Sequence, residues 1–448
     1  MSEDFVPKIL EEKFDRCSQA VQRFFARLPL AIGGRYLRAE REKPSVGLAD
    51  DSRELVSHHG KDTTARWAGV RPALSVRRPA GQNAPMKFGL SVSTIVPKPW
   101  DRESERRVFF QNAELIELAD ELGFDSCWSV EHHFLEEYSH MSAPDVFFAY
   151  CAGRTKQIRF GHGIYLMLPQ INHPARIAER VATLDILSNG RVELGTGRCA
   201  TWTELGGFLI EPDDTKERWE ETTRAVVEMW MSDEYAHDGK HFQMPPRNVL
   251  PKPVQVPHPP LWVAVQSPET AVLAGQHRIG MLGVTLGGIP RYADLIADYR
   301  RAIRDCDEPL GATMNNQVRA QGQMFVHPDS AYARKAIGKA ADQLAGPLSS
   351  YLMTMGSTYP SPAYHTHSLG SGNAFAPPLG ADQVGRLVGN PDEVAKAVED
   401  WDRLGVDALN IGVGGRWSTH EENLDSMRLF AREIMPHFVN RPVGAASG

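Results

Sequence analysis

Short apolar runs alternate with longer amphipathic stretches along residues 86–438. An apolar run of about four to eight residues is typical of a buried strand, whereas apolar residues that recur every three to four positions are typical of a helix. Regular alternation of the two predicts parallel βαβ units. The predicted strands are residues 87–92, 126–130, 158–168, 191–197, 261–265, 280–285, 317–326 and 408–413. The predicted helices are residues 105–122, 144–155, 174–187, 213–231, 290–306, 330–344 and 421–435, together with one that opens at Pro268.

Eight strand–helix units in about 350 residues predict a (β/α)8 barrel, the TIM-barrel fold of the α/β class, with insertions. A doubly wound sheet is the competing architecture. However, the first predicted strand is not followed by Gly-x-Gly-x-x-Gly, and the chain has no P-loop. Residues 346–380 are rich in Gly, Pro, Ser and aromatic residues and have no clear period. A long irregular segment of this kind is typical of a lid or of disorder.

Residues 1–85 differ in character from the rest of the chain. A helix is predicted near residues 8–28, and the stretch that follows, rich in Arg, Pro, Gly and Ser, has the composition of a disordered segment. Met86 stands directly before the first predicted strand, which suggests that it is the natural start of the protein. The alternative is that residues 1–85 are a targeting segment, although the acidic residues near the N-terminus argue against a transit peptide. We expect a partly disordered extension at 1–85, a barrel domain at 86–438 and a disordered tail at 439–448.

The composition is that of an ordinary globular protein. The net charge of −7 comes without a basic stripe, which argues against nucleic acid as a partner. No uncharged apolar run approaches the roughly 18 residues of a membrane helix, and no signal peptide follows Met1. The five cysteines are scattered without a Cys-x-x-Cys motif, which argues against a disulfide framework and a structural zinc site. A cytoplasmic location without membrane contact is therefore predicted.

The second predicted strand leads directly into Glu131, His132, His133 and Phe134. In a β/α barrel the strand ends carry side chains into the active site, and imidazole exchanges protons near neutral pH. The ordinary alternative is a strand end with a capping glutamate and two surface histidines. A metal site is a further alternative, but adjacent residues of a strand point to opposite sides, so His132 and His133 are poorly placed to share one ion.

The helix after the fifth predicted strand opens with Ser267, Pro268, Glu269 and Thr270. Backbone N–H groups and two hydroxyls at a helix N-terminus predict an anion site. The alternative is that Ser267 only caps the helix, and the two roles can coexist.

Taken in order along residues 86–438, these motifs resemble the bacterial luciferase-like flavin-dependent monooxygenases, which are TIM barrels. Each motif is weak alone, and the resemblance is carried by their order and their barrel spacing. The matching segments are Glu131-His132-His133-Phe134, Leu168-Pro169, His173-Pro174-x-Arg176-x-Ala178-Glu179, residues 183–191, residues 193–198 and residues 388–394.

The resemblance implies a monooxygenase that uses reduced FMN and dioxygen to oxygenate a small organic substrate. It also implies that the protein is a homo-oligomer and that a partner, an NAD(P)H:flavin reductase, supplies the reduced FMN. The chain lacks a dinucleotide-binding fingerprint, which agrees with an external source of reductant. Two alternatives stay open on the same barrel. One is an F420-dependent dehydrogenase that transfers hydride without oxygen, and the other is a non-catalytic flavin-binding protein.

The resemblance also implies roles for the residues at the strand ends. It assigns proton transfer to His132, an orienting role to His133, and to Glu131 the role of fixing one imidazole. Residues 346–380 would form the lid that excludes water. Trp202 and Phe208 are candidates for the substrate pocket, with core packing as the alternative.

For the cofactor, the resemblance implies phosphate contacts from Arg198, Ser267 and Thr270. A surface ion pair is the alternative for Arg198, and Arg218 is a further arginine candidate. A non-proline cis peptide is implied near Gly163, Ile164 and Tyr165, where the backbone would support the flavin ring.

Overall fold

The computed structural model describes residues 85–439 apart from 137, 200, 284–287, 307–308, 338–385 and 414–417. The predicted extension and tail therefore lie outside the described residues, apart from Pro85 and Val439. The predicted lid at 346–380 lies outside them entirely.

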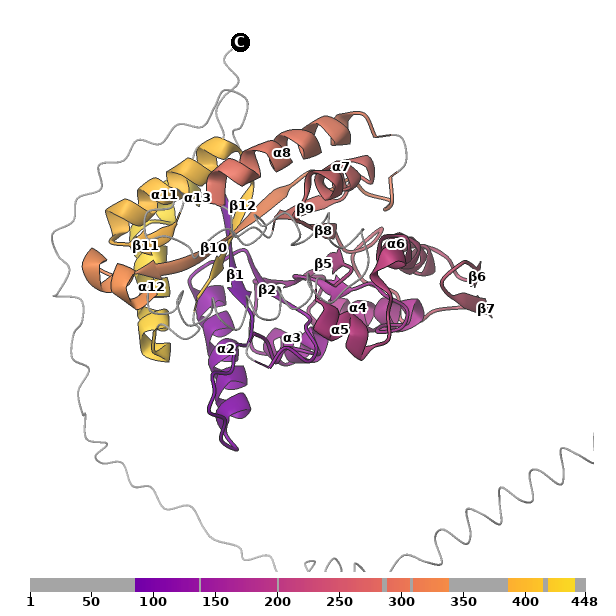
Figure 1. The fold of residues 1–448 in the computed structure, drawn as a ribbon, viewed down its shortest axis with the longest axis horizontal. Helices are drawn as coiled ribbons and strands as arrows, with labels where there is room; N and C mark the ends of the chain where they lie inside the picture. Colours follow the sequence, from indigo (N-terminus) through magenta and orange to yellow (C-terminus); the bar gives the residue numbers. More distant parts are fainter. Residues whose placement is uncertain are drawn as a thin grey trace, which may run out of the picture. The chain divides into compact units, whose positions relative to one another are not determined.

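Eight parallel strands close into a barrel that is surrounded by helices, which confirms the predicted fold (Figure 1). Around the barrel the strands follow the order β12, β1, β2, β3, β5, β8, β9 and β10, and pairing of β10 with β12 completes the ring. The barrel strands are β1 (Lys87–Val92), β2 (Ser126–Ser129), β3 (Arg159–His162), β5 (Val192–Gly197), β8 (Leu261–Val265), β9 (Gly280–Gly283), β10 (Val318–Val326) and β12 (Ala408–Gly412).

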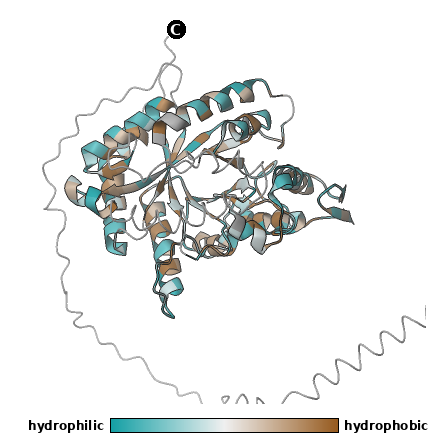
Figure 2. Ribbon diagram, in the orientation of Figure 1, coloured by the Kyte–Doolittle hydropathy of each residue, from teal (hydrophilic) through white to brown (hydrophobic). Residues whose placement is uncertain are grey.

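Some helices, such as α11, begin and end at residues that suit helix ends. Asn390 and Glu393 form a capping box at the start of α11, and Gly405, with a φ of 89°, ends the same helix. Figure 2 shows that the helices around the barrel carry both hydrophilic and hydrophobic residues. The helices are α2 (Ser104–Glu121), α3 (Pro144–Ala152), α4 (Pro174–Leu187), α5 (Trp202–Gly207), η2 (Pro212–Asp214), α6 (Thr215–Met231), α7 (Pro268–Gln276), α8 (Gly288–Arg304), α11 (Pro391–Leu404), α12 (His420–Glu433) and α13 (Pro436–Val439).

Several elements differ from the sequence prediction. The predicted third strand is divided into β3 and a two-residue strand, β4 (Tyr165–Leu166), which pairs with β5. The antiparallel pair β6 (Tyr235–Asp238) and β7 (Gln243–Arg247) was not predicted, because two prolines in β7 argue against a strand. β11 (Leu387–Gly389), which extends the sheet beside β10, and α5 were also missed, since each is too short to show a period.

No helix in the described part of the chain is long and apolar enough to cross a membrane.

Near the amino-terminal ends of the strands, Arg319 of β10 fills the barrel interior. Its guanidinium carbon lies 5.2 Å from the ring centres of both Trp128 and Trp262, and the side chain is 1% exposed. Arg319 Nη2 donates to Asp125 Oδ2 at 2.5 Å, and Nη1 donates to Ser126 Oγ at 3.0 Å. Burial would raise the pKa of Asp125, but Arg319 and Lys87 together lower it below its ordinary value.

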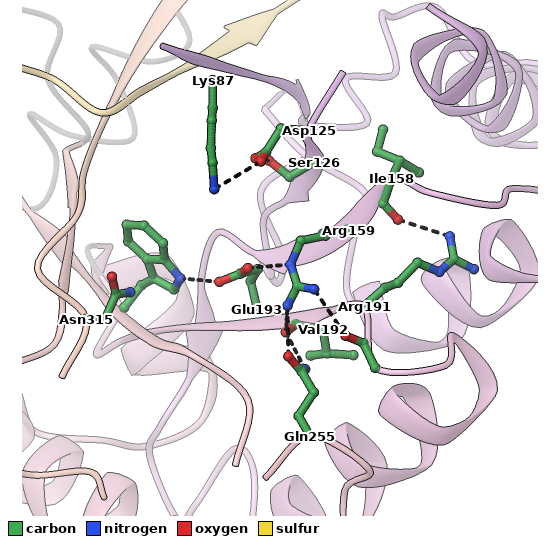
Figure 3. A network of polar contacts seen from close by, with 12 residues as sticks. Lys87, Asp125, Ser126, Ile158, Arg159, Arg191, Val192, Glu193, Gln255 and Asn315 are labelled. Carbon is green, nitrogen blue, oxygen red and sulfur yellow. Dashed lines mark hydrogen bonds and ion pairs between the residues drawn. The ribbon is translucent and has the colours of Figure 1, made fainter. Parts of the chain in front are cut away.

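A second carboxylate extends this polar network toward the outside of the barrel. Glu193 accepts hydrogen bonds from Trp262 Nε1 at 2.7 Å and from Arg159 Nε at 2.5 Å. Figure 3 shows Arg159 between Glu193 and Gln255, with Lys87 directed at Asp125. Buried charges of this kind need such partners, because an unpaired charge inside a protein is strongly destabilising.

His162, the last residue of β3, is fully buried. Neither ring nitrogen has a hydrogen-bond partner among the described residues, and the ring packs between Phe148 and Tyr165 with centroid distances of 5.8 and 5.0 Å. Burial lowers the pKa of His162 from 6.5 to about 4. An unfolded histidine takes up a proton below about pH 6.5, whereas the folded one stays neutral down to about pH 4. The stability that neutral His162 contributes is therefore present above pH 6.5 and is lost as the pH falls from about 6.5 to about 4.

We predict that His162→Leu reduces the loss of stability on acidification. Relative to the variant, the natural protein should lose about 3 kcal/mol in the free energy of unfolding between pH 7 and pH 4. Urea unfolding at a series of pH values measures this difference, with His437→Gln on α13 as the control. Equal pH slopes for the natural protein and His162→Leu would show that His162 is not the acid-sensitive group.

Candidate active site

The loop after β2 lies at the carboxyl end of the barrel, where the strand ends of the parallel barrel meet. Its backbone is fixed by a hydrogen bond from His132 N to Met141 O at 2.9 Å. Phe134 has a φ of 62°, and its ring packs on Phe208 with a centroid distance of 5.1 Å. A Cβ at Gly207 would lie 2.6 Å from the Phe134 ring, so the glycine in α5 allows the loop to pack closely.

Glu204 of α5 is the carboxylate partner of His132. His132 Nδ1 and Glu204 Oε1 are 3.0 Å apart, and the backbone N–H of His133 donates to the same oxygen at 3.0 Å. The Glu204 side chain is 0% exposed, and Thr201 Oγ1 donates to its other oxygen at 2.6 Å. Burial would raise the pKa of Glu204, but the charge interaction and hydrogen bond with His132, with help from Thr201, lower it below its ordinary value.

An ionised carboxylate only accepts hydrogen bonds, so this contact places a proton on His132 Nδ1. His132 Nε2 has no hydrogen-bond partner within the described residues, and the side chain is 19% exposed. The imidazole is therefore fixed at one nitrogen and open at the other. That arrangement suits the exchange of a proton with a bound molecule.

Sequence reasoning missed Glu204, although a signal for it exists. Thr201 and Glu204 have the spacing of a capping box, in which Thr201 accepts from the backbone N–H of Glu204, here at 3.3 Å. In an ordinary capping box the glutamate reaches back to the backbone of the capping residue. Here the Glu204 carboxylate contacts the two residues that the sequence singled out, His132 and His133.

Glu131 is the carboxylate partner of His133, and it also contacts β4 and the loop before α4. Its Oε1 lies 3.2 Å from His133 Nε2 and accepts from Asn172 Nδ2 at 2.8 Å. Its Oε2 accepts from the backbone N–H of Leu166 in β4 at 2.8 Å. Glu131 is 3% exposed, so these contacts are shielded from water. Each histidine thus has its own carboxylate, and sequence reasoning also missed Asn172.

Among residues 85–439, excluding the segments not described, no group of three or more His, Cys, Asp or Glu side chains is arranged to hold a metal ion.

The predicted non-proline cis peptide is confirmed at the bond between Gly163 and Ile164. The Ile164 side chain packs with Trp128 and Trp262 in the barrel interior. A Cβ at Gly197 would lie 2.0 Å from Ile164 Cδ1, so glycine at this position of β5 leaves room for the Ile164 side chain. Tyr165 is 1% exposed and its ring lies in the hydrophobic core, where burial raises its pKa. A contact of Tyr165 with a cofactor would therefore come from its main chain.

The hydroxyls predicted to bind an anion lie together at the start of α7. Ser267 caps this helix, because its Oγ accepts from the backbone N–H of Thr270 at 3.3 Å. The two hydroxyl oxygens are 3.2 Å apart. Arg198, just past β5, donates from Nη1 to Thr215 Oγ1 at 3.2 Å.

The structure also shows the contacts of two further candidate residues. Arg218 makes a two-point ion pair with Asp214, with N–O distances of 2.7 and 2.6 Å. Phe208 packs against the rings of Phe134 and His133, which makes it part of the loop packing around the histidines. The Trp202 side chain lies outside the part of the chain that the structure describes.

Comparisons with known proteins agree with this geometry. A family model described as luciferase-like monooxygenase matches residues 86–408. The 4-hydroxyprotoasukamycin monooxygenase of Streptomyces nodosus subsp. asukaensis is 28% identical over 373 residues, which are 79% of this chain and 92% of that protein. The crystal structure of the monooxygenase RslO1 from Streptomyces bottropensis has a TM-score of 0.65 and 27% identity, and the match covers 79% of this chain and 100% of that one.

Other relatives match over shorter stretches. The oxygenase component of the flavin-dependent trigonelline monooxygenase of Acinetobacter baylyi is 30% identical over 194 residues, 43% of this chain and 52% of that protein. The F420-dependent glucose-6-phosphate dehydrogenase of Amycolatopsis mediterranei is 30% identical over 194 residues, 41% of this chain and 57% of that protein. The chain thus spans about half the length of several curated relatives that it matches.

Proposed function

The chain belongs to the luciferase-like monooxygenase family, and from this premise we propose that it uses reduced FMN and dioxygen to oxygenate a small organic substrate. The observation that carries the proposal is His132 at the barrel mouth, fixed through Nδ1 by buried Glu204 and open at Nε2. When bound, reduced FMN supplies the two electrons by which one oxygen atom enters the substrate and the other leaves as water.

The residues around the mouth fit such a cofactor. The Ser267 and Thr270 hydroxyls are close enough to contact one phosphate group together, and a helix N-terminus favours an anion there. The guanidinium of Arg198 suits the same group, because its planar donors match oxyanions. Ile164 and the main chain of Tyr165 would support the ring, next to the glycine at position 197 of β5.

His132 would move the proton that the reaction needs. With Nδ1–H directed at Glu204, its Nε2 gives a proton to the substrate oxygen or takes one from it. Glu204 stabilises the charged imidazole during that exchange. His133 and Glu131 hold the loop in place from the other side.

We further propose that a separate NAD(P)H:flavin reductase delivers the reduced FMN. The support is a relative whose name describes an oxygenase component. An F420-dependent dehydrogenase is the second candidate function, favoured by the F420-dependent relative.

Anaerobic titration with reduced FMN and, separately, with reduced F420 tests the proposed function. We expect reduced FMN to bind and to be oxidised when oxygen is admitted. Binding of reduced F420 without binding of reduced FMN would favour the dehydrogenase and contradict our proposal.

We predict that the double variant Ser267→Ala with Thr270→Ala binds reduced FMN at least tenfold more weakly. A buried, charge-assisted contact to phosphate contributes about 1.5–3 kcal/mol. Affinity is measured by anaerobic fluorescence titration, with reduced riboflavin as the ligand that lacks the phosphate.

Asn390→Ala is the matched control, since it removes a helix cap on α11 far along the chain from α7. The phosphate assignment fails if the double variant binds reduced FMN normally. It also fails if riboflavin binding falls by the same factor.

A further inference from the structure

A cavity opens on the side of the barrel mouth opposite the proposed cofactor residues. It has a volume of about 340 Å³ and is lined by the ends of β1, β10 and β12, the N-terminal half of α2 and the first turn of α12. In the closed strand order these three strands are neighbours, and they face β3, β5 and β8 across the barrel. The proposed cofactor residues follow β3, β5 and β8, so the cavity has a lining of its own.

The loop after β1 connects this cavity to the loop that carries His132. Asn112 in the lining donates from Nδ2 to Thr94 Oγ1 at 3.0 Å. The Thr94 carbonyl accepts from His140 N at 3.0 Å, and the Met141 carbonyl accepts from His132 N at 2.9 Å. The cavity wall and the backbone of His132 therefore belong to one hydrogen-bonded pair of loops.

Three polar side chains of the lining are available to a ligand. Ser93, Gln111 and Gln323 have no side-chain hydrogen-bond partner within the described residues. Gln323 lies against Gly412, where an added Cβ would be 2.7 Å from the amide oxygen, so the glycine leaves room for the amide. When the protein leaves polar groups at a cavity wall without hydrogen-bond partners, these groups can orient a bound small molecule.

The charge of the lining favours an anion. The described lining contains no aspartate or glutamate. Its basic side chains are Arg107, whose guanidinium is half exposed and 3.4 Å from Asp101, and His420, whose Nε2 lies 2.7 Å from Glu114. Val108 and Leu115 contribute apolar surface beside these donors. A carboxylate only accepts hydrogen bonds, so it matches amide, hydroxyl and guanidinium donors and would be repelled by a second carboxylate.

We infer that this cavity binds the organic substrate and that the substrate is a small ionised carboxylic acid. Its apolar part lies against Val108 and Leu115, and its carboxylate is directed at the amides of Gln111 and Gln323. The inference rests on the proposed oxygenation, because it places the acid beside the loop of His132.

The test uses the full-length protein with hexanoate and benzoate as probes and the neutral hexanamide and benzamide as their counterparts. Gln111→Glu and Gln323→Glu each keep the side-chain shape and add a negative charge. We expect the acids to bind more tightly than the amides, and each variant to weaken acid binding by about tenfold or more while changing amide binding little. Isothermal titration calorimetry measures both, and Gln157→Glu, an exposed change just before β3, is the matched control.

Binding of the amides as tightly as the acids would overturn the inference, as would acid binding that neither glutamate variant weakens. Binding of reduced FMN is measured on the same samples to check that each variant is folded. If the natural protein binds reduced FMN but none of the acids, the cavity assignment is wrong and the proposed function stands. If it binds the acids at this cavity but not reduced FMN, the proposed function is wrong.

Discussion

Alanine in place of His132 is expected to leave reduced FMN bound and to lower the yield of oxygenated product by about 10²–10⁴-fold, the usual contribution of a positioned acid–base group. His132 meets Glu204 through Nδ1 at 3.0 Å and is open at Nε2, so the variant loses the exchangeable proton but keeps the barrel. Oxygen consumed by the variant should appear mostly as hydrogen peroxide. Rapid mixing of the FMN-loaded protein with oxygen, followed by assay of product and peroxide, measures the effect.

His133→Ala is the matched control, because its ring contacts Glu131 at 3.2 Å and not Glu204. It should reduce the yield much less than His132→Ala. Glu204→Gln keeps the shape of the side chain but removes its charge, and it should give an intermediate loss. If His133→Ala abolishes turnover while His132→Ala is near normal, the two roles are reversed. If neither variant matters, the residues mark the family and do not carry its chemistry.

Some elements with a strong local signal could be predicted from the sequence, although α11, which has a capping box, was missed. The strand at residues 261–265 was predicted with the bounds of β8, because its apolar run follows two prolines and precedes a capping serine. The helix that ends at Leu187 was predicted as α4 for a similar reason, with Pro174 in its first turn. The position of His132 at a strand end followed from the same local pattern.

Contacts between distant segments could not be predicted in this way. His132 and Glu204 are 72 positions apart, and they meet only because α5 packs under the loop after β2. Arg319 stands in a predicted strand, and no local pattern indicates that its charge lies against the rings of Trp128 and Trp262. The sequence therefore predicted which polar side chains follow the strand ends, while the partners that position these side chains depend on tertiary packing.

The largest effect on stability is expected at Arg319. Arg319→Ala would leave the carboxylate of Asp125 without its buried partner and open a space beside the packed rings of Trp128 and Trp262. Breaking a buried ion pair by removing one partner costs about 3–5 kcal/mol. We therefore expect the free energy of unfolding, measured by urea denaturation, to fall by that amount.

A surface pair supplies the control for this prediction. Arg300 Nη2 and Asp407 Oδ2 are 2.7 Å apart, but their side chains are 29% and 32% exposed, so Arg300→Ala should cost about 0–1 kcal/mol. Arg319→Lys separates the charge from the ring contacts, because lysine keeps a positive charge beside Asp125 but lacks the flat guanidinium that contacts both indoles. Its loss should fall between those of the two alanine variants. If Arg319→Ala destabilises the protein no more than Arg300→Ala does, the buried guanidinium is not what holds the interior of the barrel together.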